Sequence, residues 1–571
     1  MDQIKIKPII NLKSIGEVLL ALGVLGFGVW RSSFGLENVM DIRFYDESYY
    51  LTQGVFQPVN SWLADYSPLY SLHYLLFSKL AGCDPINLYY QNYRFWAFII
   101  SFTVFSTLRF AGANYWFALL WALCCLSAEI NYPLWPKAGH LAMSGVFLSL
   151  AGVIYLRSRP LESSFFCTGM CFLIAWCRPE FILGACLGML ITGYQFWKTR
   201  AKTFSIHHVW ILIPFLLACL CWIIWGLPVG YSGRGMVAIG QHYVHNWRNF
   251  SGNNKTELLW DWINWREQFG KDFGTTENLF IAFSNNPIAF CKHIWFNLSA
   301  LPGRCFLYFF ETLLPNRWFG LPLGTSIFVL WLVVEFSHKF NILMNWFENS
   351  KSKFFKIAPA LLIVSIPSLA AALLFQPRPH YLIPLFPVFL LAVGSLVKDY
   401  TFPFLKAEVK SFIGVAFLMV VLYYLPNANA YFIKDSSPKA TSSKSSELNY
   451  FQPLIHSGLK DKLIAEELIQ MNWPAGIRMF DASTGCADYL GKRVERFGKT
   501  GFEINYPLLS DFGKFIKKEN INAVFLERVF FYDRSFSKQK SWQEFKANWK
   551  KSDWNKIPVG ENGDSLFLKN L

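Results

Sequence analysis

Long apolar runs separated by short polar gaps constrain this chain more than any other feature. Several of the runs approach the roughly 20 residues that a helix needs to cross a bilayer, and the first covers residues 15–30. Only 16% of the residues are charged and 18% are aromatic, whereas a soluble domain has roughly 25% charged residues. Aromatic side chains concentrate at membrane interfaces. The sequence therefore predicts a polytopic α-helical membrane protein.

The net charge of +15 raises the possibility of a nucleic-acid partner, but its distribution argues against one. The basic residues cluster in the short gaps between apolar runs, which is the pattern of cytoplasmic loops. Lys5, Lys7 and Lys13 precede the first run, so we predict a cytoplasmic N-terminus and an uncleaved first span. Membrane lipid, and not nucleic acid, is the expected surrounding, in the plasma (inner) membrane.

We predict about eleven spans within a membrane domain of residues 1–433. They are 15–30, 94–110, 115–128, a fourth ending before Arg157, two separated by Arg178-Pro179-Glu180, 209–226, 319–336, 357–375, 381–397 and 412–425. The aromatic stretch 287–314 is better explained as a helix lying on the membrane. Counting it as a span would move the later basic loops outside, against the distribution of Lys and Arg.

A Ser/Lys-rich linker at 434–447 marks a domain boundary. Residues 448–571 have a soluble composition and are expected outside the membrane. Strands are predicted at Ile477–Asp481, Val494–Phe497 and Ala523–Leu526, with helices at Leu508–Lys518 and Trp542–Lys550. This alternation predicts a small extracytoplasmic α/β domain.

The stretch that follows the first span carries three carboxylates, Asp41, Asp46 and Glu47, among aromatic residues. Carboxylates are costly close to a membrane and tend to be kept there for a function. They can take up a proton or hold a cation at the water interface. The alternative is an ordinary solvated loop.

Three further features are predicted on the outer side of the membrane. One is Ser67-Pro68-Leu69-Tyr70, which opens an amphipathic interface stretch ending near Gly82. The second is Arg178-Pro179-Glu180, where Pro interrupts the helix and the charged pair needs partners. The third is the run from Gln376 to Pro387, which contains Arg378 and His380.

Together these features resemble the GT-C superfamily of membrane glycosyltransferases, in particular protein O-mannosyltransferases and the bacterial transferases that add aminoarabinose to lipid A. The resemblance rests on Asp46-Glu47-Ser48-Tyr49-Tyr50 in the first outer loop and on Arg378-Pro379-His380-Tyr381-Leu382-Ile383-Pro384 at a late span. A C-terminal soluble domain is similar too. One departure is Ser67, where the aminoarabinose transferases have a Lys that meets the donor phosphate.

The resemblance implies an inverting cell-envelope transferase that moves a sugar from a polyprenyl-phosphate donor to a hydroxyl of a glycan, lipid or protein acceptor on the outer face. Deprotonation of that hydroxyl needs a base, and a carboxylate suits this role. The motif assigns it to Asp46, with Glu47 positioning Asp46 or binding acceptor or metal. No cofactor is implied with certainty, and a divalent cation is compatible with the resemblance.

The remaining candidates follow from the need for cations around a leaving lipid phosphate. The donor-binding candidates are Arg378, His380, Tyr381, Lys137, His140 and Arg94. The acceptor-binding candidates are Asp41, Tyr49, Tyr50 and His242. Snorkelling interface charges explain such cations equally well in the absence of a site.

Two other functions fit a chain of this kind. A transporter or flippase of lipid-linked saccharides would carry charges within its spans and repeated halves, whereas here the charges lie at outer helix ends and no repeat is visible. A non-enzymatic scaffold would not need three carboxylates beside the first span.

Overall fold

The computed structural model is mostly helical and ends in a small mixed sheet. It describes residues 12–38, 45–126, 137–156, 159–199, 206–229, 234–252, 264–276, 278–311, 357–396, scattered positions from 415 to 422, 460–470, 477–481, 485–490, 494–497, 511–526, 539–548, 554–559 and 564–569. The predicted spans 319–336 and, for the most part, 412–425 lie outside this set, as does the linker 434–447.

Four described helices are long and apolar enough to cross a membrane, and the chain is an integral membrane protein. They are α1 (Leu12–Ser32), α4 (Pro85–Ala111), α6 (Ala138–Tyr155) and the helix Ile357–Leu374. Shorter apolar helices pack among them: α5 (Tyr115–Leu126), α7 (Pro160–Ile174), α9 (Ile213–Trp225) and α17 (Phe386–Leu396). The helix α8 (Phe181–Thr199) lies along α7.

Local sequence explains where the longest of these helices begins and ends. Asp84 caps α4 by accepting a hydrogen bond from the Asn87 N–H at 3.2 Å, and Pro85 occupies the first turn. Gly112 ends the helix with φ 99°. Near this end, Gly394 of α17 packs against Ala111 with no room for a side chain. Small residues allow such close helix contacts in a membrane.

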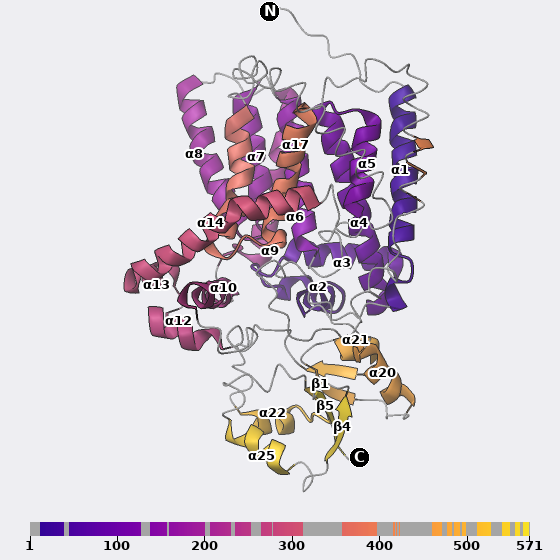
Figure 1. Cartoon of the computed structure of the whole chain (residues 1–571), viewed down its shortest axis with the longest axis vertical. Helices are drawn as coiled ribbons and strands as arrows, with labels where there is room; N and C mark the ends of the chain where they lie inside the picture. The colour runs from indigo at the N-terminus through magenta and orange to yellow at the C-terminus, as the bar shows by residue number, and fades with distance from the viewer. Residues whose placement is uncertain are drawn as a thin grey trace, which may run out of the picture.

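Short helices gather at one end of the bundle, the end that faces the C-terminal sheet (Figure 1). They are α2 (Tyr45–Phe56), α3 (Pro68–Ala81), α10 (Arg234–Ser251), α12 (Trp265–Phe273) and α13 (Leu279–Asn285). The helix α14 (Pro287–Glu311) continues from α13 and runs across the bundle at a slant to α7 and α8 (Figure 1). It is not among the described candidate spans, and its predicted place on the membrane stays a prediction.

The C-terminal domain contains a five-stranded sheet with strand order β2-β1-β3-β5-β4. The parallel strands β1 (Ile477–Asp481), β2 (Val494–Phe497) and β3 (Ala523–Leu526) have the predicted bounds. The sequence analysis missed the antiparallel pair β4 (Trp554–Val559) and β5 (Asp564–Lys569). Asn562-Gly563 lies between these two strands, and this dipeptide is a strong hairpin signal.

Helices flank the sheet and connect it to the membrane domain. They are α20 (Lys460–Gln470), α21 (Gly485–Leu490), α22 (Phe512–Lys518) and α25 (Lys540–Asn548). The Tyr489 hydroxyl of α21 lies 3.1 Å from the Tyr90 hydroxyl of α4, within hydrogen-bonding distance. The C-terminal domain therefore contacts the bundle at the end that carries α2 and α3.

Candidate functional site

Glu47 of α2 is at the centre of a buried polar cluster, and only 4% of its surface is exposed. Its Oε1 accepts hydrogen bonds from the hydroxyls of Tyr70 and Tyr74 and from Asn92 Nδ2 at 2.9 Å. Its Oε2 accepts the backbone N–H of Lys137 at 3.0 Å. One carboxylate thus connects α2 with α3, α4 and the start of α6.

The Glu47 cluster lies in a region of low solvation. Burial raises the pKa of Glu47, although the hydrogen bonds from Tyr70 and Tyr74 act in the opposite direction. Burial also lowers the pKa of Lys137 to about 7, against the attraction of Glu47. Lys137 Nζ lies 3.5 Å from His140 Nε2 and 5.1 Å from the centre of the Tyr93 ring. Lys137 and His140, which were both predicted to bind the donor, therefore lie side by side.

We expect Glu47→Gln to destabilise the protein. The amide nitrogen of the glutamine would face a group that now donates a hydrogen bond to the Glu47 carboxylate. A buried donor left unpaired costs about 1–3 kcal/mol. The measurement is the thermal unfolding midpoint of purified variants in one detergent. Glu37→Gln is the matched control, since Glu37 forms a partly exposed ion pair with Arg94 that contributes about 0–1 kcal/mol. Equal midpoints for Glu47→Gln and wild type would contradict the structural role of Glu47.

Asp41 and the side chain of Asp46 lie outside the described part of the chain. Their predicted roles in acceptor binding and as the base therefore remain predictions. Among the described residues, no group of three or more His, Cys, Asp or Glu side chains could hold a metal ion.

A second part of the site is the turn between α7 and α8, which lies against the start of α3. Ser67 Oγ donates to the Cys177 carbonyl at 2.6 Å, and Cys177 Sγ contacts the Ala138 carbonyl at 3.1 Å. Ser67 itself has a left-handed backbone with φ 50°, a conformation that costs a non-glycine residue about 1–3 kcal/mol. Ser67 therefore directly precedes α3 and contacts the residue before Arg178.

Arg178 is placed by an ion pair and by an aromatic ring. Its guanidinium lies 2.7 Å from Glu180 Oε1, and its Cζ lies 5.0 Å from the centre of the Tyr381 ring. The sequence analysis noted the charged triplet but did not include Arg178 among the donor-binding residues. The sequence signal for Arg178 was a charged pair between two apolar runs. The sequence could not indicate its contact with Tyr381, because Tyr381 lies far away in the chain.

Arg378 immediately precedes α16 (Pro379–Leu382), the short helix that contains Tyr381. Arg378 Nε donates to Gln376 Oε1 at 2.8 Å, and Gln376 Nε2 donates to His245 Nδ1 at 3.2 Å. Burial, with a contribution from nearby Arg304, lowers the pKa of Arg378 to about 10. The guanidinium is therefore charged at neutral pH and hydrogen-bonds a neutral amide.

Two histidines lie beside the same tyrosine. The ring centre of His380 is 4.1 Å from that of Tyr381, and the ring centre of His242 is 6.0 Å away. Burial and the positive charge of Arg378 hold the pKa of His242 well below its usual value and lower that of His245 to about 3. His242 and His245 are thus neutral at pH 7, as expected in a region of positive potential.

The start of α6 brings the two parts of the site together. Gly139 packs so closely on α16 and the following turn that a Cβ there would lie 3.3 Å from the His380 carbonyl oxygen and 3.0 Å from Ile383 Cγ2. Lys137 is two residues earlier, at the Glu47 cluster. Gly139 has no side chain, so the start of α6 packs directly on the segment that contains His380 and Tyr381. The Glu47 cluster therefore adjoins this segment.

Three of the residues predicted to bind donor or acceptor contact other protein side chains. Arg94, predicted to bind the donor, forms an ion pair with Glu37 and donates to Ser33 Oγ at 3.3 Å. Tyr50, predicted to bind the acceptor, is 3% exposed and packs on Tyr70. The ring of Tyr49 lies 4.8 Å from that of Tyr66. Tyr50 is therefore part of the packing beneath the site.

Comparison with known proteins gives a structural match only. No protein-family model matches the chain, and no curated protein matches its sequence. Among solved structures, the chain is similar to the crystal structure of ArnT from Cupriavidus metallidurans bound to undecaprenyl phosphate. The match covers 98% of each chain at 12% identity, with a TM-score of 0.38.

Proposed function

We propose that this protein is a membrane glycosyltransferase of the GT-C type, which transfers a sugar from a polyprenyl-phosphate donor to an acceptor hydroxyl at the membrane end that carries α2 and α3. The acceptor is a glycan, lipid or protein hydroxyl. The single observation that carries this proposal is the pair of partly buried cations at Tyr381, with Arg178 on its ring and Arg378 three residues before it in the chain.

The cations around Tyr381 favour an anionic ligand. Arg378 is partly buried, and its Nε donates a hydrogen bond to the neutral Gln376. Arg304 adds a second positive charge nearby. Positive charges at a partly desolvated site attract an anion more strongly than they do in water. A lipid-linked phosphate suits such a site, because arginine can donate two parallel hydrogen bonds to it.

Arg178 accounts for the departure at Ser67. Ser67 is hydrogen-bonded to Cys177, and Arg178 is the next residue. The backbone of the residue before Arg178 thus contacts the position where the aminoarabinose transferases have Lys. Glu180 already pairs with Arg178, so we assign the main phosphate contact to Arg378 and a supporting contact to Arg178.

The chemistry follows from these assignments. The Asp46 carboxylate takes the proton of the acceptor hydroxyl as its oxygen attacks the anomeric carbon of the sugar. The bond from that carbon to the phosphate oxygen breaks, and the polyprenyl phosphate leaves with an added negative charge. Arg378 stabilises this charge as it develops. Glu47 holds α2 in place through Tyr70, Tyr74 and Asn92.

The decisive experiment removes the gene and compares lipid-linked sugars and surface glycans by mass spectrometry. We expect one polyprenyl-phosphate sugar to accumulate while one glycosylated product disappears. The purified protein should then convert that donor in vitro and release polyprenyl phosphate. A flippase would move the donor across a bilayer and leave its sugar–phosphate bond intact, which would contradict the proposal.

We also predict that the end carrying α2 and α3 faces outside. Cys83 follows α3 and is exposed at this end. The helix α8 begins beside Arg178 and ends at Thr199, about 28 Å further along its axis at 1.5 Å per residue, so the exposed Lys198 marks the opposite side. In a background without other exposed cysteines, a membrane-impermeant maleimide should label Cys83 in intact cells but not Lys198→Cys. Labelling of Lys198→Cys alone would reverse the orientation, and labelling of both would contradict the path of α8.

A further inference from the structure

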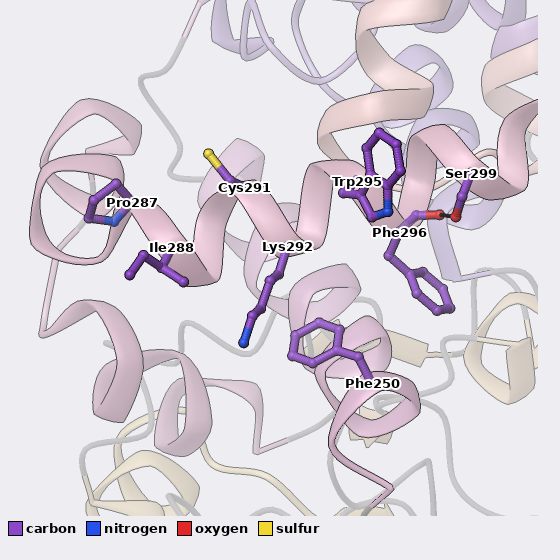
Figure 2. A pocket seen from close by; sticks show the side chains of 8 residues that line it. All are labelled: Phe250, Pro287, Ile288, Cys291, Lys292, Trp295, Phe296 and Ser299. Atoms are coloured by element: carbon purple, nitrogen blue, oxygen red, sulfur yellow. Dashed lines mark hydrogen bonds between the residues drawn. The ribbon is translucent and has the colours of Figure 1, made fainter.

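An open groove of about 760 Å³ runs between α10 and α14, and its side chains play no part in the site described above. It is lined by Phe250, Pro287, Ile288, Cys291, Lys292, Trp295, Phe296 and Ser299 (Figure 2). Its volume lies within the range of about 300–1,000 Å³ that is typical of small-molecule sites. Most of its lining is apolar, so its ligand has a large apolar part.

The groove contains one charged side chain. Figure 2 shows that Lys292 extends from α14 toward Phe250 of α10, and that Phe296 points to the same side. Among the described residues that line the groove there is no carboxylate. An ammonium group at the end of an apolar stem, above apolar walls, is suited to a ligand with an apolar chain and an anionic head.

The position of α14 brings this groove to the membrane. At its C-terminal end, the ring of Phe309 stacks on Phe389 of the apolar helix α17 with centroids 4.4 Å apart. Toward its N-terminal end, Ile288 and Trp295 are each 69% exposed, and Phe280 of α13 is 82% exposed. Apolar side chains of this size, with Trp and Lys between them, are typical of helices that lie in the lipid interface.

We propose that the groove between α10 and α14 binds an anionic phospholipid of the surrounding bilayer, with an acyl chain along Phe250, Ile288 and Phe296 and the phosphate on Lys292. The surrounding bilayer supplies phospholipid as a ligand for a groove that opens at the interface. A bound peptide would need several partners for its backbone, and beside Lys292 the described residues that line the groove offer only Ser299, the Cys291 thiol and the Trp295 indole as polar side chains. The proposal is independent of sugar transfer.

The native Cys291 allows a direct test, because it lines the groove while its side chain points away from Lys292 and Phe250 (Figure 2). The other exposed cysteines, Cys83, Cys186 and Cys219, are replaced by Ser, and Cys291 is labelled with a fluorophore. The full-length protein is placed in phosphatidylcholine nanodiscs. Three nanodisc samples are compared, each with the same small fraction of one spin-labelled lipid. The three lipids are phosphatidylglycerol, phosphatidylcholine and a polyprenyl phosphate.

We expect phosphatidylglycerol to quench the fluorophore about fivefold more than phosphatidylcholine, as one lysine near an anionic lipid supplies about that preference. Lys292→Glu should abolish the preference, and Lys292→Gln is a second variant should the first fail to fold. Lys271→Glu, the same change at an exposed position of α12, should retain it. Equal quenching by both phospholipids, an equal loss in Lys271→Glu, or stronger quenching by the polyprenyl phosphate would each overturn the proposal.

Discussion

Asp46→Asn is expected to lower sugar transfer by about 10²–10⁴-fold, the usual cost of losing a general base. The substitution keeps the shape of the side chain and removes its basicity, so donor binding should change little while turnover falls. The measurement is steady-state turnover of the purified protein with a polyprenyl-phosphate sugar donor. Asp46→Glu, which keeps a carboxylate, should retain more activity than Asp46→Asn.

The matched control for this prediction is Asp84→Asn. Asp84 caps α4, and Asn is an equally good capping residue, so this variant loses one carboxylate outside the candidate site. Near-wild-type turnover in a folded Asp46→Asn protein would remove Asp46 from the role of base. Glu47 would not simply replace it, because all the described contacts of Glu47 hold it within the structure.

Arg378→Ala should weaken both donor binding and turnover, because the phosphate is charged before transfer and gains charge during it. Truncating one partner of a buried, hydrogen-bonded charge pair costs about 2–5 kcal/mol, so we expect kcat/KM for the donor to fall by about 30- to 5,000-fold. Arg378→Lys should restore part of this loss, since the point charge survives and the bidentate geometry does not.

Lys137→Ala is the comparison that locates the phosphate. Lys137 is buried at the Glu47 cluster, and its pKa of about 7 leaves it only partly charged at neutral pH. We therefore expect it to affect donor binding less than Arg378 does. If Arg378→Ala has wild-type kinetics while Lys137→Ala is inactive, the phosphate belongs beside His140 and not beside Tyr381.

The local pattern of the sequence was sufficient for the four long apolar helices and for three of the five described strands. Apolar runs predicted α1, α4, α6 and the helix Ile357–Leu374, because a bilayer imposes both length and composition on a spanning helix. Strands β1 to β3 had the predicted bounds, because they are short runs rich in apolar residues. The hairpin β4–β5 was missed although Asn562-Gly563 marked it.

The polar contacts within the site depend on tertiary structure. Nothing in the stretch Asp46-Glu47 distinguishes the two carboxylates, and only the packing of α3 and α4 around α2 surrounds Glu47 with Tyr70, Tyr74 and Asn92. Sequence also provides no means to pair Arg94 with Glu37 in preference to a donor phosphate. Such pairings join segments that are far apart in the chain, so no local sequence pattern predicts them.

The sequence by itself determined that this chain is an integral membrane protein with acidic and basic motifs at helix ends, since hydropathy and charge are local properties. Only the tertiary structure decided which charges meet. It placed Arg178 on the ring of Tyr381 and packed Gly139, two residues after Lys137, against the backbone of His380. The reason is physical: burial and hydrogen bonding between distant segments decide whether a charge supports the fold or faces a ligand, and both arise only when the helices have packed.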